Sequence, residues 1–98
     1  MSGMRTARIG DLRLVASTIA PGAELVRVHP DDGPHYDRMI VVTVHGDTVH
    51  LMGWIGTPLT PSQWSQAAAV FFPAARQVRF ERMQADGSLR HVTLPLAA

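Results

Sequence analysis

The stretch RMIVVTVHGDTVHLMGWI, residues 38 to 55, consists of two runs rich in β-forming residues on either side of Gly46-Asp47. A two-residue loop with glycine first is typical of a type II′ turn, which joins two antiparallel strands. This turn sets the register, so Val42 is expected to face Leu51 on the buried side of a sheet. The stretch therefore predicts a β-hairpin with one face in the core.

The opposite side of this hairpin is apolar at the end far from the turn. There the same register pairs Val41 with Met52 and Met39 with Trp54. Exposed apolar patches often mark interaction sites, and Trp and Met are enriched in interfaces. The sequence therefore predicts an interface made by Met39, Val41, Met52 and Trp54, which would contact a partner protein or a second copy. The alternative is that the amino-terminal segment or the helix described next covers this patch.

A single amphipathic helix is predicted over about residues 60–72. Thr60 is a good N-cap, Pro61 suits the first helical position, and Gln63 completes a capping box. An apolar stripe at helical spacing follows, and its alanines permit a close approach to a sheet: Trp64, Ala67, Ala68 and Phe71. Pro73 ends the helix because a proline disfavours helical geometry at the residue before it.

Residues 77 to 96 form a second predicted hairpin, around the loop Ala85-Asp86-Gly87. A three-residue loop that ends in glycine fits a type I turn followed by a left-handed residue. The resulting register pairs these residues across the hairpin: Val78 with Leu94, Phe80 with Val92, Glu81 with His91, and Arg82 with Arg90. The first two pairs are expected in the core.

Arginines gather in and beside this second hairpin. Like charges directly opposite each other destabilise a strand pair, so Arg82 facing Arg90 favours a nearby anion. With two neighbours, they make a candidate contact for phosphates or nucleic acid: Arg76, Arg79, Arg82 and Arg90. The alternative is that the two opposed side chains spread into water near the hairpin tip.

Residues 11 to 29 fit two patterns. Apolar residues at helical spacing would form a helix capped by Asp11, whereas alternation on both sides of Pro21-Gly22 favours two strands. We expect two strands. The fold class predicted from the whole chain is α+β: an antiparallel β-sheet of four to six strands, with one helix packed on one face. The expected element order is β-β-β-β-α-β-β.

The densest polar cluster lies in residues 29 to 37. It contains two histidines and three aspartates, a set that could ligate a divalent metal or supply an acid and a base: His29, Asp31, Asp32, His35 and Asp37. The two prolines and one glycine of this segment instead indicate a solvated loop. We therefore predict no metal site, no catalytic residue and no cofactor, and leave a metal-binding protein or small enzyme as an alternative.

Composition limits the classes of protein to consider. The chain has 98 residues, 46% of them hydrophobic and 17% charged, which is typical of one globular domain covering residues 1–98. No cysteine is present, so disulfides and thiolate metal sites are excluded, and a cytoplasmic protein is expected. The longest apolar run, residues 67 to 75, is too short to cross a bilayer, so no membrane association is expected.

Residues 52 to 56, MGWIG, followed by the predicted helix and hairpin, resemble part of an acyl-CoA-dependent N-acetyltransferase. The similarity covers about half the chain and lacks the glycine-rich pyrophosphate loop of that family, so it implies no residue roles. The first functional hypothesis is a non-enzymatic interaction or assembly module: a complex subunit, a homo-oligomer, or a small inhibitor such as a phage or mobile-element accessory protein. The alternative hypothesis is a nucleic-acid-associated protein that uses the arginines of the second hairpin.

Overall fold

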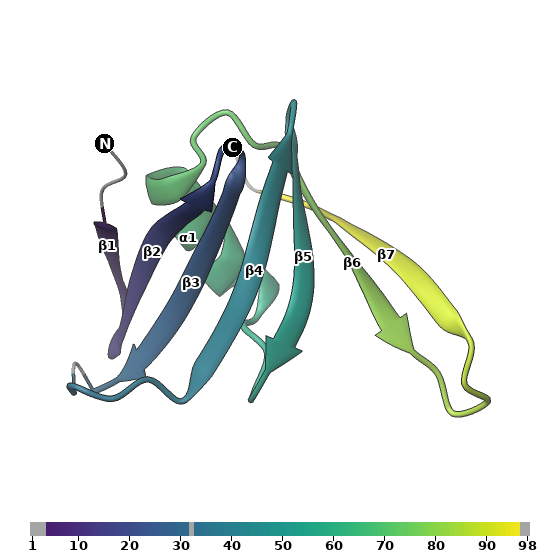
Figure 1. Cartoon of the computed structure of the whole chain (residues 1–98), viewed down its shortest axis with the longest axis horizontal. Helices are drawn as coiled ribbons and strands as arrows, with labels where there is room; N and C mark the ends of the chain where they lie inside the picture. Colours follow the sequence, from purple (N-terminus) through teal and green to yellow (C-terminus); the bar gives the residue numbers. More distant parts are fainter. Residues whose placement is uncertain (1–3, 32, 97–98) are drawn as a thin grey trace.

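Seven strands form one sheet in chain order, with a single helix behind it, in the computed structural model of this protein (Figure 1). The structure describes residues 4–31 and 33–96. Neighbouring strands are antiparallel, except β5 and β6, which are parallel and joined through the helix. The elements are β1 Met4–Ile9, β2 Leu12–Ala20, β3 Ala23–Pro30, β4 Arg38–His45, β5 Thr48–Ile55, α1 Pro61–Phe71, β6 Gln77–Met83 and β7 Leu89–Pro95.

The predicted α+β class with one helix on the sheet is confirmed, but the expected four to six strands and their order are wrong. The additional strand is β1, which pairs with β2 through a turn at Gly10. Its core-facing residues Ala7 and Ile9 are buried between exposed arginines, so the apolar alternation in the sequence is weak. The expectation of two strands in residues 11 to 29 is confirmed by β2 and β3.

The helix begins and ends as its sequence predicts. The backbone N–H of Gln63 donates to the Thr60 hydroxyl at 3.1 Å, and the Thr60 N–H donates to the Gln63 side chain at 2.9 Å. Its buried stripe packs on one face of the sheet, and its backbone comes closest to β1. The core between helix and sheet includes Leu14, Val26, Val28, Ile40, Val42, Val49, Leu51, Trp64, Ala67, Phe71 and Val78.

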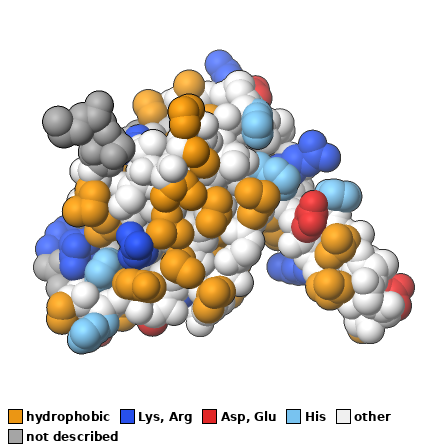
Figure 2. Space-filling model, viewed as in Figure 1, with side chains coloured by type: hydrophobic (Ala, Val, Ile, Leu, Met, Phe, Trp, Pro, Cys, Tyr) orange, Lys and Arg blue, Asp and Glu red, His pale blue; other side chains and the backbone are white. Residues whose placement is uncertain are grey.

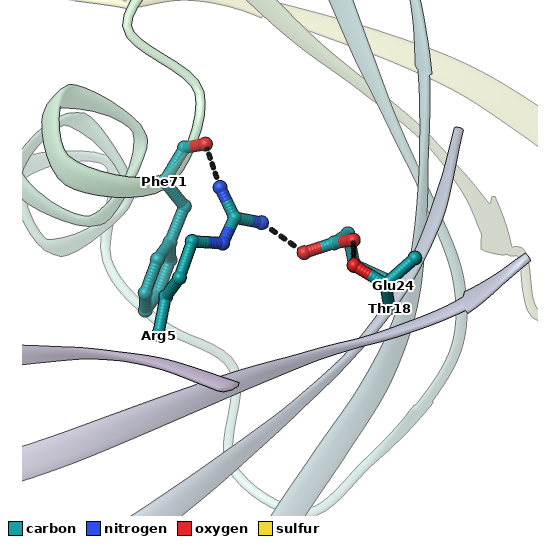
Figure 3. A network of polar contacts seen from close by, with 4 residues as sticks. All are labelled: Arg5, Thr18, Glu24 and Phe71. Atoms are coloured by element: carbon teal, nitrogen blue, oxygen red, sulfur yellow. Dashed lines mark hydrogen bonds and ion pairs between the residues drawn. The ribbon is translucent and has the colours of Figure 1, made fainter. Parts of the chain in front are cut away.

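A polar network ties the end of the helix to the edge of the sheet (Figure 3). Arg5 of β1 forms an ion pair with Glu24 of β3 and donates to the Phe71 carbonyl at 2.6 Å. The Thr18 hydroxyl donates to the second Glu24 oxygen at 2.5 Å. Glu24 is only 7% exposed, so these donors replace the water that its carboxylate loses on folding. The network therefore fixes where α1 ends relative to β1.

The predicted register of the first hairpin is confirmed near the turn and wrong at its far end. Val42 pairs with Leu51 and Val41 with Met52, as expected. Beyond them a β-bulge intervenes, and Met39 pairs with Ile55 instead of Trp54. Within it Gly53 has a φ of 66°, a conformation that an L-residue rarely adopts. The extra residue reverses the side on which every following side chain lies.

Gly53 in this bulge and Gly56 just after it both have positive φ, but only Gly56 is sterically confined. A Cβ at Gly56 would lie 2.6 Å from the Arg38 side chain and 2.8 Å from the Asp37 carbonyl oxygen, whereas a Cβ at Gly53 meets nothing within 4 Å. We expect Gly53→Ala to cost about 1–2 kcal/mol of unfolding free energy from backbone strain alone. Gly56→Ala should cost about 3 kcal/mol, because overlap adds to strain. Urea denaturation of both variants, followed by circular dichroism, compares the costs; equal costs would contradict the confinement at Gly56.

The register predicted for the second hairpin is confirmed at every pair from Val78–Leu94 to Met83–Leu89. Gly87 is left-handed at the turn, with a φ of 86°. The Ser88 hydroxyl and N–H both donate to Asp86, at 2.6 Å and 2.9 Å, and these hydrogen bonds lower the pKa of that carboxyl. The loop thus carries its own hydrogen bonds.

This hairpin is attached to the sheet along a short seam only. β6 pairs with β5 at three positions, which end at His50 opposite Arg79. Beyond them the two strands diverge, and β6 and β7 extend away from the rest of the sheet (Figure 1). In the part of the chain that the structure describes, no helix is long and apolar enough to cross a membrane.

Candidate functional site

One face of the sheet carries the helix, and the other face of β1 to β5 is covered by no element among residues 4–31 and 33–96. Side chains at alternate strand positions place six apolar residues there, which we call the open face: Val15, Leu25, Met39, Val41, Met52 and Ile55. Met52 is 44% exposed and Ile55 60% exposed. Figure 2 shows this side, with hydrophobic side chains gathered across the strands. Val15 is 8% exposed and the other three are partly buried, so Met52 and Ile55 supply most of the exposed apolar area of the open face.

The open face has a one-sided charge. Strands β1 to β5 contain a single acidic residue, Glu24, and it points to the helix side. The same register places Arg8, Arg13 and Arg27 on the open side. The Arg27 guanidinium lies over the Tyr36 ring, 5.4 Å from its centroid, and Tyr36 also meets His29 edge to face. The apolar surface is therefore bordered by cations and aromatic rings.

The predicted interface is divided by the bulge. Met39, Val41 and Met52 share the open face as the sequence indicates. Trp54 lies on the helix side, where its ring meets Trp64 edge to face at 6.1 Å between centroids. Its indole N–H donates to the Gly56 carbonyl at 2.6 Å. Sequence reasoning missed Ile55, which takes the place expected for Trp54; the glycine within the strand, Gly53, is the local signal that could have indicated the bulge.

An apolar groove of about 460 Å³ lies on the helix side, at the place where β5 and β6 diverge. Its floor comes from the core and both tryptophans of the chain, including Ile40, Leu51, Trp54, Leu59 and Trp64. The hairpin forms its second wall with Phe80, Arg82, Met83 and Leu94. A volume of this size lies within the range of ligand-binding clefts in proteins.

The structure does not bring the four arginines of the predicted anion contact to one surface. Arg82 lies opposite Arg90, as expected, on the groove side of the hairpin. Arg79 lies on the other side with His50, and Arg76 precedes the strand. Near them, the Glu81 carboxylate and the His91 ring are 4.0 Å apart, and Glu81 is also among the residues that line the groove. Of the four, only Arg82 and Arg90 therefore face each other on one side of the hairpin.

Two polar side chains of the 29–37 loop, those of His29 and Asp37, make contacts with residues close by in the chain. His29 is buried and its Nδ1 lies 3.1 Å from the Gly33 carbonyl oxygen. Asp37 accepts from the Arg38 guanidinium at 3.0 Å, while Asp31 adopts a left-handed φ of 52°. Asp32 lies outside the described residues. Among the residues that are described, no three His, Asp or Glu side chains stand together as a metal site would need.

Comparison with protein-family models, with curated proteins and with solved structures finds no match to this chain. The resemblance of residues 52 to 56 and the elements after them to N-acetyltransferases therefore has no support from a related sequence or fold. The two surfaces described above, the open face and the groove, remain the basis for any functional assignment.

Proposed function

We propose that this protein is a non-enzymatic interaction module whose open face binds a partner protein. The observation that carries the proposal is the β1 to β5 surface with Met39, Val41, Met52 and Ile55 on β4 and β5 and no covering element among the described residues. Monomeric proteins rarely leave so broad an apolar surface in water, because covering it recovers hydrophobic free energy. Flexible methionines also suit such a surface to packing against another protein.

The charge of the open face argues for the chemistry of the partner. A homo-oligomer formed through this face would bring the arginines of two copies, Arg27 among them, to one interface. Among strands β1 to β5 the one acidic residue, Glu24, lies on the helix side, so these strands add no negative charge to such an interface. A different protein, with an apolar surface bordered by Asp and Glu, matches both features. We therefore propose a hetero-complex over a homo-oligomer formed through this face.

Val41→Lys should abolish the complex with this partner and leave the fold intact, because Val41 is only partly buried at the centre of the open face. Hot-spot residues near the centre of an interface cost about 2 kcal/mol or more when truncated, about thirtyfold in affinity, and a buried lysine charge adds to that cost. The experiment captures partners from an extract of the source cells with the wild type and with Val41→Lys. A captured protein is then purified, and its binding is measured by calorimetry at two salt concentrations.

Val70→Lys is the matched control, because Val70 is an exposed apolar residue on the outer side of α1. The proposal requires a partner that binds the wild type and Val70→Lys alike, fails with Val41→Lys, and binds more weakly in high salt. It is wrong if light scattering shows a dimer that Val41→Lys dissociates. It is also wrong if no captured protein distinguishes the two lysine variants.

A further inference from the structure

The groove on the helix side offers two free strand edges as well as an apolar wall. β5 continues to Ile55 and β6 to Met83, but the pairing between them ends at His50 and Arg79. Between these points and the ends of the strands, the facing edges have no strand partner among the described residues. Unpaired edges of this kind bind extended peptides, because main-chain hydrogen bonds extend the sheet.

Gly53 lies in the free part of β5 and makes this edge accessible. A Cβ built on it would meet nothing within 4 Å, so the space beside its backbone is open. A glycine within a strand often marks a place where another backbone approaches closely. The adjacent Trp54 turns into the groove beside Trp64, where alternate apolar side chains of an added strand would pack.

Arg82 and Arg90 supply the polar end of the groove. They face each other across the hairpin on the groove side, and Arg82 is part of the groove wall. No hydrogen bond or ion pair joins either guanidinium to a carboxylate of the described chain. A directly opposed like-charge pair destabilises a hairpin, so an anion from another molecule would relieve it. Arginine binds carboxylates with particular strength through paired N–H donors.

We propose that this groove binds an extended peptide that adds as a strand to the free edge of β5. Its alternate apolar side chains lie against Trp54 and Trp64, and an acidic residue near one end meets Arg82 and Arg90. This site lies at the free edge of β5 and adjoins the open face at Met52, which lines the groove, while Val41 takes no part in it. Because backbone hydrogen bonds supply much of the affinity in strand addition, a generic peptide of this chemistry is an adequate probe.

The probe is the fluorescein-labelled peptide TVTVTVDE, with the sequence TVTVTVKK as its charge control. Fluorescence anisotropy reports binding. A change in the tryptophan emission of the protein reports occupancy of the groove, since the two tryptophans of the chain, Trp54 and Trp64, both line it. Arg82→Glu should lower the affinity for the acidic peptide TVTVTVDE at least about tenfold, because the substitution reverses the charge that faces the peptide. Arg79→Glu, on the other side of the same strand, should leave the affinity unchanged.

Two further probes test whether the peptide adds as a strand: TVTVTVDE methylated on the backbone nitrogens of its valines, and the same peptide methylated on those of its threonines. At least one of them must lose binding, because each removes the donors along one edge. Retention by both overturns strand addition, and equal effects of Arg82→Glu and Arg79→Glu overturn the role of the arginine pair. No saturable binding up to about 1 mM, the weak limit of specific recognition, overturns the proposal altogether.

Val41→Lys separates this site from the open face. The variant should bind TVTVTVDE with unchanged affinity, because Val41 points away from the groove. If Val41→Lys abolishes peptide binding while Arg82→Glu does not, the peptide binds the open face and the groove proposal is wrong. Loss of the partner complex in Val41→Lys with peptide binding retained would leave both proposals standing.

Discussion

Trp64→Ala is expected to lower the free energy of unfolding by about 3–5 kcal/mol, the range for truncating a buried tryptophan or phenylalanine to alanine. Trp64 is 6% exposed and is the largest side chain that α1 places on the sheet. Its removal leaves a cavity beside Trp54 that the rigid sheet cannot close. Because the free energy of unfolding of a domain is about 5–15 kcal/mol in total, a loss of this size would leave a large fraction of the protein unfolded if the wild type lies near the lower end.

Urea denaturation followed by far-ultraviolet circular dichroism measures this loss, since tryptophan fluorescence itself changes in the variant. Val70→Ala on the exposed side of the helix is the control, with an expected effect within about 0.5 kcal/mol. If Trp64→Ala itself unfolds the protein, Trp64→Phe keeps the measurement accessible with a smaller loss. A loss below about 1 kcal/mol for Trp64→Ala would contradict the packing of α1 on the sheet.

Arg5→Met is expected to cost about 3 kcal/mol, the lower end of the range for breaking a buried ion pair. It leaves the carboxylate of Glu24, 7% exposed, with only the Thr18 hydroxyl as a donor. It also removes the donor to the Phe71 carbonyl and the cation over the Phe71 and Phe72 rings. The lower end applies because the Arg5 side chain is 42% exposed, and water screens part of the interaction.

The double variant Arg5→Met/Glu24→Leu distinguishes a charge effect from lost packing. Replacing both members of a buried pair with apolar residues is often neutral, so the double variant should recover most of the stability lost in Arg5→Met. A double-mutant cycle, in urea with the same detection, gives the coupling energy of the pair. A coupling below about 0.5 kcal/mol would show that Glu24 does not depend on Arg5.

The candidate surfaces were predictable only in part. The shared face of Met39, Val41 and Met52 was predictable from the register that the Gly46-Asp47 turn sets. That register holds as long as every residue of one strand pairs with one residue of the other. At Gly53 the count changes, so Trp54 moves to the groove and Ile55 to the open face. Whether a glycine in a strand makes a bulge depends on the backbone it faces, which the local sequence does not contain.

The groove lies beyond the reach of local sequence signals for a related reason. Its walls come from β4, β5, α1 and the second hairpin, which meet through the short parallel seam between β5 and β6. Parallel pairing joins segments that are separated by a whole helix, and no turn sets its register. The point where this pairing ends therefore depends on tertiary packing. Val49 pairs with Val78 across the two strands, and α1, which connects β5 to β6 in the chain, packs on the sheet.

The sequence by itself determined the elements and pairings that turns and caps control. These are the helix from Pro61 to Phe71, both hairpins around glycine turns, and the opposition of Arg82 and Arg90, all governed by residues close together in the chain. Only the tertiary structure decided that β1 completes the sheet, that Trp54 lies in a groove, and that one face stays open. Those features depend on contacts between distant segments, where burial and steric fit outweigh local preference.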